Sequence, residues 1–150
     1  MGEEVEDMMA KRILVPLSDG AESPAVSLVR AIAQDQGSTV RLLRVMPVPE
    51  HVVDLYGRTV SYADQEMASF TARGLSELAL AEHQLDGVPV ETVVRFGEPV
   101  EEILLEADAF HADLIAMTTT ERSRLKSAIA PGVGERVLRA ADVPVLLLRD

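Results

Sequence analysis

Two polar segments carry the side chains that could bind a ligand. The first, Ser18-Asp19-Gly20, follows a short apolar run and offers a hydroxyl and a carboxylate. The second extends from Thr118 to Gly134 and contains three consecutive threonines and three cations, Arg122, Arg124 and Lys126. Near the end of this segment, the backbone N–H groups of Gly132 and Val133 precede a predicted helix, where an anion can bind. The alternative is that the second segment is a solvated loop, with threonines ending a strand.

The remaining polar residues do not form a recognisable catalytic or metal-binding motif. The chain has no cysteine, no Gly-x-Ser-x-Gly motif and no Gly-x4-Gly-Lys-Ser/Thr phosphate loop. Its three histidines lack the spacing of helical metal ligands; they are His51, His83 and His111. Acidic residues crowd one predicted helix and are interpreted as a solvated face; they are Glu101, Glu102, Glu106 and Asp108. We therefore expect no catalytic residues and no metal site.

Five apolar runs alternate with helical patterns along the chain, which predicts an α/β domain. The predicted strands are 13–17, 40–46, 90–96, 113–118 and 143–148, and a loop extends from Pro47 to about Gly57. Pro24 is suited to the first turn of a helix that ends at Gly37. The longest helix is predicted from about Ser61 to Gln84, with one buried stripe; its residues are Met67, Phe70, Gly74, Leu78, Ala81 and Leu85. Two further helices open at Gly97-Glu98-Pro99 and at Pro131.

This order predicts a doubly wound three-layer α/β/α fold whose parallel sheet has the strand order 3-2-1-4-5. In such sheets, ligands bind beyond the carboxyl ends of the strands, where the strand order reverses. The first and fourth strands flank that point. Both polar segments follow these strands, so we expect them to lie at the same edge of the sheet.

Composition restricts the partners and the compartment. The chain has 150 residues, with 14 Lys plus Arg against 25 Asp plus Glu, a formal charge of −11. So acidic a surface repels phosphate backbones and anionic lipids, which argues against nucleic acid and membranes as partners. No apolar run is long enough to span a bilayer. An acidic tail is expected over residues 1–10 and one domain over 11–150, and the absence of cysteine favours the cytoplasm.

The order of several short motifs resembles the universal stress proteins over nearly the whole chain. The matching segments are Ile13-Leu14-Val15-Pro16-Leu17, Leu42-Leu43-Arg44-Val45, Gly97-Glu98-Pro99, Ala112 to Met117, Glu135 to Arg139 and Val143 to Arg149. The resemblance implies an adenine nucleotide alpha hydrolase-like fold, which is Rossmann-like, and a role in stress response. Some members of the family bind ATP and others do not.

The glycine motif of the ATP-binding members is degraded in this sequence. That motif is Gly, two residues, Gly, nine residues, Gly, then Ser or Thr, and the glycines let backbone N–H groups approach phosphate. Laid between Met117 and Glu135 without a gap, its four positions hold Thr118, Glu121, Pro131 and Gly132. Proline has no N–H to donate, and the glutamate places a carboxylate near the phosphates. We therefore expect no cofactor, with ATP or AMP and Mg²⁺ as the alternative.

If a nucleotide does bind, the resemblance also implies its remaining contacts. The family's acidic residue falls on Ser18, or on Asp19 if the turn has one extra residue, and Val45 matches the place where the second strand meets adenine. With Met117, Thr118, Gly132 and Val133 these residues form the nucleotide site of this alternative.

The last strand predicts self-association. It is strongly apolar and lies at the sheet edge, where an unpaired strand is a template for another chain. A twofold partner would cover it, as family members often do; the residues concerned are Val143, Val145, Leu146, Leu147 and Leu148. The other possibility is that a helix or the tail covers this edge. We expect a non-catalytic, homodimeric stress-response module, with a nucleotide-binding sensor as the main alternative and a hydrolase or nucleotide-transfer enzyme as a weaker one.

Overall fold

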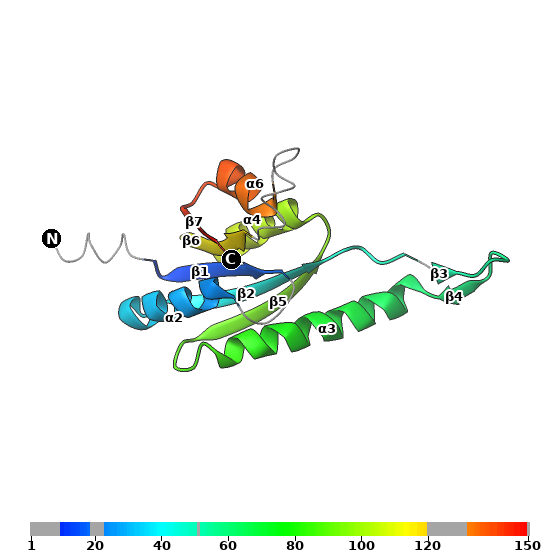
Figure 1. The fold of residues 1–150 in the computed structure, drawn as a ribbon, viewed down its shortest axis with the longest axis horizontal. Coiled ribbons are helices and arrows are strands. Elements are labelled where there is room, and N and C mark those ends of the chain that lie inside the picture. Colours follow the sequence, from blue (N-terminus) through cyan, green and yellow to red (C-terminus); the bar gives the residue numbers. More distant parts are fainter. Residues whose placement is uncertain (1–9, 19–22, 51, 120–131, 150) are drawn as a thin grey trace.

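A five-stranded parallel sheet forms the centre of the computed structural model, which describes residues 10–18, 23–50, 52–119 and 132–149 (Figure 1). Its strands are β1 (Arg12–Leu17), β2 (Thr39–Met46), β5 (Val90–Phe96), β6 (Leu114–Thr119) and β7 (Val145–Arg149). They lie in the order β5-β2-β1-β6-β7, and every neighbouring pair is parallel. The predicted fold and strand order are confirmed. Residues 1–9 of the acidic tail lie outside the described residues.

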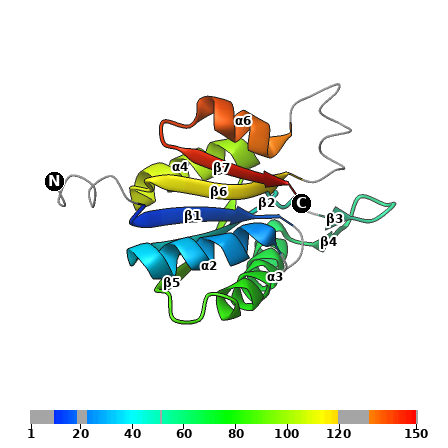
Figure 2. The same ribbon diagram turned by 60° about the vertical axis from the view of Figure 1, so that its left-hand side comes forward.

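Helices cover both faces of the sheet, as Figure 2 shows. α2 (Pro24–Gln36) and α3 (Ala63–His83) lie on one face, and α4 (Pro99–Phe110) and α6 (Val133–Ala140) lie on the other. Alternate residues of β1 enter two separate apolar clusters, because successive side chains of a strand point to opposite faces. Ile13 and Val15 pack with α2 and α3, whereas Leu14 packs with α4. Burial on both faces explains the nearly continuous apolar strands.

The ends of α2 follow directly from the sequence. Ser23 is the N-cap and its Oγ accepts a hydrogen bond from the Ala25 N–H at 3.2 Å. Pro24 takes the first helical position, where its missing N–H costs nothing. Gly37 ends the helix with φ +67°, and its N–H donates to the Ala33 carbonyl at 2.8 Å. This left-handed conformation is one that glycine adopts without strain.

The segment between β2 and the sheet-covering half of α3 projects from the domain. It contains the antiparallel hairpin β3 (Val52–Val53) and β4 (Thr59–Ser61), where the sequence predicted only a loop. The buried residues of α3 all lie in its second half: Gly74, Leu78 and Ala81. Figure 1 shows the first half and the hairpin extending beyond the sheet. We call residues 48–50 and 52–73 the arm.

The predicted buried stripe of α3 is therefore correct only in part. Met67 is 41% exposed, because no strand lies beneath this part of the helix. Where α3 reaches the sheet, Gly74 permits close contact with it. A Cβ at this position would lie 3.0 Å from Val94 Cγ2 and 3.2 Å from Met46 Cε.

The interpretation of the acidic residues of α4 as a solvated face is wrong for two of them. Glu106 is only 4% exposed and binds two strand arginines, Arg41 at 2.5 Å and Arg95 at 3.0 Å. Glu102 pairs with the same Arg95 at 2.9 Å. Arg41 also binds Glu91 of the edge strand β5 at 3.0 Å. The helix is thus attached to β2 and β5 by an ion-pair network that its own sequence does not reveal.

Candidate functional site

The sheet brings the ends of β1, β2 and β6 together, as the sequence predicted. β1 lies between the other two strands, and its register pairs Leu17 with Arg44 of β2. Ser18 is exposed directly beyond this pair. On the other side, Met117 is 5% exposed, and Thr118 and Thr119 are half-buried at the end of β6. The described part of the predicted nucleotide site is therefore contiguous along one edge.

Several predicted site residues lie outside the described residues. These are Asp19 of the first polar segment and Arg122, Arg124 and Lys126 of the second. The choice between Ser18 and Asp19 for the acidic position, and the anion contacts of the three cations, therefore stay predictions. Val45 packs against the apolar cluster beneath α4, so its residue type is explained by the core.

A backbone N–H group at the start of α6 is already hydrogen-bonded to a carboxylate of the protein. Gly132 is the N-cap, and its N–H donates to Glu135 Oε2 at 2.7 Å. Glu135 thus satisfies one of the donors that an anion would use at a helix N-terminus. It also places a negative charge at the positive end of the helix, which stabilises α6 and disfavours a second anion there. Val133 begins the helix directly after this capped residue.

A second carboxylate lies next to α6. Glu98 is the N-cap of α4, and its Oε2 accepts a hydrogen bond from the Glu101 N–H at 2.9 Å. This hydrogen bond lowers the pKa of Glu98, and Arg136 of α6 adds to the effect. The Arg136 guanidinium lies 3.3 Å from Glu98 Oε1. Arg136, a cation of α6, is therefore partly neutralised by a residue of the protein.

The lowered pKa of Glu98 predicts the sign of a pH effect. A carboxyl whose pKa is lower in the folded state stabilises the fold above its unfolded pKa, about 4.3, and loses this contribution as pH falls through the lowered value. Glu98→Gln is therefore expected to destabilise the protein at pH 7, and the difference from the natural protein is expected to shrink as the pH falls below that unfolded pKa. Urea denaturation of both proteins between pH 2.5 and 7 measures this. An equal stability difference at every pH would contradict it.

Sequence analysis missed one residue that shapes this edge. Gly134 is buried, and a Cβ there would lie 2.6 Å from Leu147 Cδ1 and 3.4 Å from Thr119 Cγ2. Its absent side chain lets α6 begin close to β6 and β7. The sequence carries no local signal for this close approach, whereas Glu135, three residues after Gly132, was an available signal for the capping of α6.

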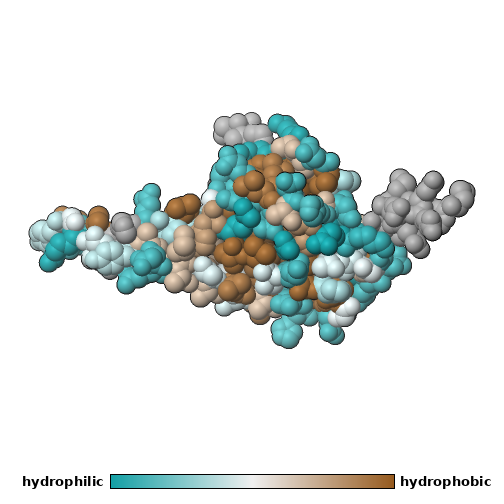
Figure 3. Space-filling model, turned by 180° about the vertical axis from the view of Figure 1, so that it is seen from behind, coloured by the Kyte–Doolittle hydropathy of each residue, from teal (hydrophilic) through white to brown (hydrophobic). Residues whose placement is uncertain are grey.

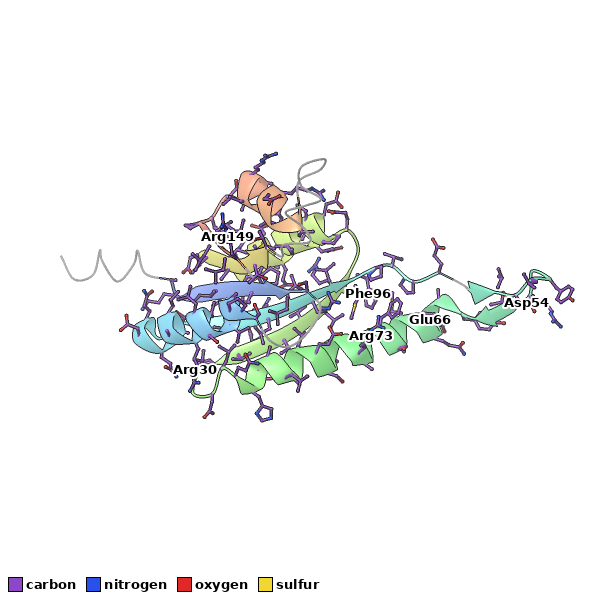
Figure 4. The ribbon with its side chains drawn as sticks, viewed as in Figure 1. Arg30, Asp54, Glu66, Arg73, Phe96 and Arg149 are labelled. Atoms are coloured by element: carbon purple, nitrogen blue, oxygen red, sulfur yellow. The ribbon has the colours of Figure 1, made fainter. Side chains whose placement is uncertain are left out.

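The predicted dimer strand lies at the edge of the sheet. β7 begins at Val145, so Val143 belongs to the connection before the strand. Among the described residues, β7 pairs only with β6, and its residues from Val145 to Leu148 are half-buried. Figure 4 labels Arg149, at the end of this strand. No element of the described chain pairs with its outer edge.

A metal site and a membrane-spanning helix are two further features that a functional site could include. The described residues contain no group of three or more His, Cys, Asp or Glu that could hold a metal ion. His83 lies in the last turn of α3 and His111 ends α4 as its C-cap, while His51 lies outside the described residues. Of the helices described, none has the length and hydropathy needed to cross a bilayer.

Solved structures share this fold over nearly the whole chain. The hypothetical protein MJ0577, the subject of a structure-based assignment of biochemical function, superposes with a TM-score of 0.74 and 25% identity, covering 95% of this chain and 97% of that one. A universal stress protein in complex with cAMP has a TM-score of 0.69 at 17% identity, covering 94% and 98%. A universal stress protein from Archaeoglobus fulgidus in complex with dAMP has a TM-score of 0.60 at 21% identity, covering 91% and 96%.

Sequence comparison identifies the family. Stress response protein NhaX from Bacillus subtilis is 31% identical over 74 residues, 49% of this chain and 43% of the relative, so the match spans less than half of that protein. Universal stress protein YxiE from Bacillus subtilis is 28% identical over 146 residues, covering 95% of this chain and 92% of the relative. The model of the universal stress protein family matches residues 9–149. The chain therefore belongs to the universal stress protein family.

Proposed function

We propose that the protein is a non-catalytic stress-response module that acts as a homodimer and does not bind ATP in the usual mode of the family. The observation that carries the proposal is the hydrogen bond from Gly132 N–H to the Glu135 carboxylate, at the position where a phosphate would meet α6. A cytoplasmic location fits a chain without cysteine, and remains part of the proposal.

The charges around this position support the exclusion of a triphosphate. Glu98 and Glu135 are both close to the start of α6, and the lowered pKa of Glu98 keeps it ionised at neutral pH. Arg136 is partly neutralised by Glu98. In the sequence, Thr118 and Pro131 replace two glycines of the phosphate-binding motif, and proline cannot donate a backbone hydrogen bond. ATP would therefore meet carboxylates and find few N–H donors.

The homodimer is supported by the outer edge of β7, with which no element of the described residues pairs. An apolar edge strand that no other element covers exposes unpaired backbone groups to pairing with another chain. A twofold axis beside β7 would pair the strand with its own copy and bury the side chains from Val145 to Leu148. Protein association would then be the way in which this module acts.

Native mass spectrometry of the purified protein tests the nucleotide part. We expect a dimer mass and no saturable adduct with Mg-ATP, whereas one stoichiometric ATP per chain would overturn the proposal. Glu135→Gln is the matched control, because it removes the charge and keeps a hydrogen-bond acceptor. If this carboxylate repels phosphate, the variant gains anion binding that the natural protein lacks.

Leu146→Lys tests the dimer, because it places a charge in the middle of β7. Sedimentation is expected to show monomers, with the circular dichroism spectrum unchanged. Leu80→Lys on α3 is the control, since Leu80 is 58% exposed on another element. Persistence of the dimer in Leu146→Lys would show that another surface holds the two copies together.

A sensor of adenine mononucleotides is the second candidate function. Two proteins of the same fold were solved with cAMP and dAMP, each of which carries one phosphate. A single phosphate needs fewer donors than a triphosphate, and the half-buried hydroxyls of Thr118 and Thr119 lie at the correct edge. Saturable binding of AMP or cAMP without binding of ATP, in the same mass spectrometry experiment, would favour this function.

A further inference from the structure

The hairpin at the end of the arm presents apolar side chains on an ordered turn. Leu55 is 100% exposed and Tyr56 is 83% exposed, the highest values among the large apolar side chains described. Asp54, labelled in Figure 4, organises the turn. Its Oδ1 accepts hydrogen bonds from the N–H groups of Tyr56 and Arg58, both at 2.9 Å, and its own N–H donates to the Arg58 carbonyl at 2.8 Å. We call residues 54–58 the arm tip.

The arm tip also carries a cation in a fixed position. Arg58 Nε binds Asp54 Oδ2 at 2.9 Å, and its guanidinium carbon lies 5.5 Å from the centre of the Tyr56 ring. The side chain of Arg58 is 75% exposed. An aliphatic, an aromatic and an arginine side chain on one rigid turn is the composition typical of an anchor in a protein interface. A solvated turn would need neither Leu55 nor Tyr56.

A pocket on the domain lies at the end of the sheet opposite to the arm. Its lining is apolar and acidic, and so complements the apolar and cationic side chains of the arm tip. Its volume is about 750 Å³, and its walls come from α4, the start of β6 and the connection between α6 and β7. The apolar part of the wall includes Leu104, Leu105, Ile115 and Val143. Three carboxylates also line it: Glu101, Asp108 and Asp142. None of the three makes an ion pair with another residue that the structure describes.

The chain topology prevents the arm tip from filling the pocket of its own molecule. The arm follows the carboxyl end of β2, whereas the pocket lies where β6 and β7 begin. All strands of the sheet are parallel, so these are opposite ends of the molecule. Figure 1 shows the arm pointing away from the domain. In Figure 3 the arm is a narrow projection that carries hydrophobic surface, and further hydrophobic surface is exposed on the domain.

We propose that the arm tip of one copy binds in this pocket of a second copy. Leu55 and Tyr56 enter between α4 and the α6–β7 connection, and Arg58 meets the carboxylates at the rim. The volume is within the range of about 300–1,000 Å³ typical of binding pockets and accommodates both side chains. The charge of the whole chain is −11, so an exposed arginine that meets these three carboxylates provides a local attraction against a general repulsion, although it already has Asp54 as a partner in the arm tip.

This contact joins two different surfaces, so each copy has a free arm and a free pocket. Such a heterologous contact closes into a ring, or a reciprocal pair, if the rotation permits, and otherwise grows into a chain. It uses no residue from Val145 to Leu148, and is separate from the strand pairing proposed above. The module would therefore have two means of self-association, of which the arm contact is the weaker and does not by itself hold Leu146→Lys together at the concentrations at which that variant sediments as a monomer.

Photo-crosslinking tests where the arm tip binds. Leu55 is replaced by benzoylphenylalanine in the full chain, which is mixed with an isotopically labelled copy and irradiated. We expect crosslinks between labelled and unlabelled chains that map to residues 101–115 and 140–143. The control has the same group in place of Leu80, which is exposed on the second half of α3. Crosslinks elsewhere, or none between chains, would overturn the proposal.

A mixing experiment tests the charge pair. Both substitutions are made in Leu146→Lys, which removes the strand pairing, and association is measured at higher protein concentration. Arg58→Glu disables the arm tip and Asp108→Arg disables the pocket, and each is expected to associate at least tenfold more weakly than Leu146→Lys alone. Mixed together they should form a one-to-one complex, because the Asp108→Arg chain keeps its arm tip and the Arg58→Glu chain keeps its pocket. Circular dichroism checks that both fold. Association equal to that of Leu146→Lys alone in both variants, or no complex on mixing, would overturn the proposal.

Discussion

Replacing Phe110 with alanine is expected to lower the free energy of unfolding by about 4 kcal/mol. Phe110 is fully buried at the end of α4. The guanidinium carbons of Arg12 and Arg41 lie 4.6 and 4.2 Å from its ring centre, so the ring is attracted to two cations as well as to apolar neighbours. Truncation leaves a cavity and removes both cation contacts at once.

Urea denaturation followed by circular dichroism measures this loss, with an unchanged slope as the sign that the unfolding reaction is the same. Phe70→Ala is the matched control. Phe70 also has an arginine over its ring, at 5.0 Å, but it is only partly buried on the arm. We expect it to cost less than about 1.5 kcal/mol. Equal effects of the two substitutions would contradict the assignment of the stable core to the sheet and α4.

Replacing Glu106 with alanine is expected to cost about 3 kcal/mol. The carboxylate is nearly inaccessible and is the shared partner of Arg41 and Arg95, whose side chains are 19% and 30% exposed. Without it, the partly buried guanidinium group of Arg41 loses its closest counter-charge, and that of Arg95 loses one of its two carboxylate partners. This loss is larger than that of a surface pair, because the remaining cations are poorly hydrated.

Glu101→Ala on the same helix is the control for Glu106→Ala. Glu101 is exposed and its side chain makes no ion pair with a described residue, so its loss is expected to change stability by less than about 0.5 kcal/mol. Both variants are compared by urea denaturation at pH 7. If the two differ by less than 1 kcal/mol, the network does not attach α4 to the sheet in the way described.

These two residues show where the sequence was informative and where it was not. Apolar runs separated by helical patterns predicted the strands, their order and the ends of α2, because burial on both faces and capping leave local signals. Glu106 was misassigned because its partners lie on β2 and β5, and Arg41 is 65 residues away. Local charge density on a helix does not reveal a distant counter-charge.

The arm and the candidate site were predictable to different degrees. The hairpin β3–β4 was missed because its strands are very short and the turn depends on the hydrogen bonds of Asp54. For the site, the strand ends were placed correctly from the fold alone. The close packing at Gly134 was not, since it depends on where α6 lies relative to β7. The capping by Glu135 had a local signal, a glutamate three residues after Gly132, which was not used.

The contact that Gly74 makes with the sheet affects the orientation of the whole arm. The part of α3 from Ala63 to Gly74 is about 17 Å long, at 1.5 Å per residue. It meets the sheet at Gly74, next to Val94 and Met46. A side chain at position 74 would move α3 away from the sheet by a few tenths of an ångström at this contact. The helix would tilt, and the displacement would be larger at the hairpin than at position 74. The direction in which the arm points thus depends on the absence of a methyl group on α3, at the place where this helix meets the sheet and far from the hairpin at the end of the arm.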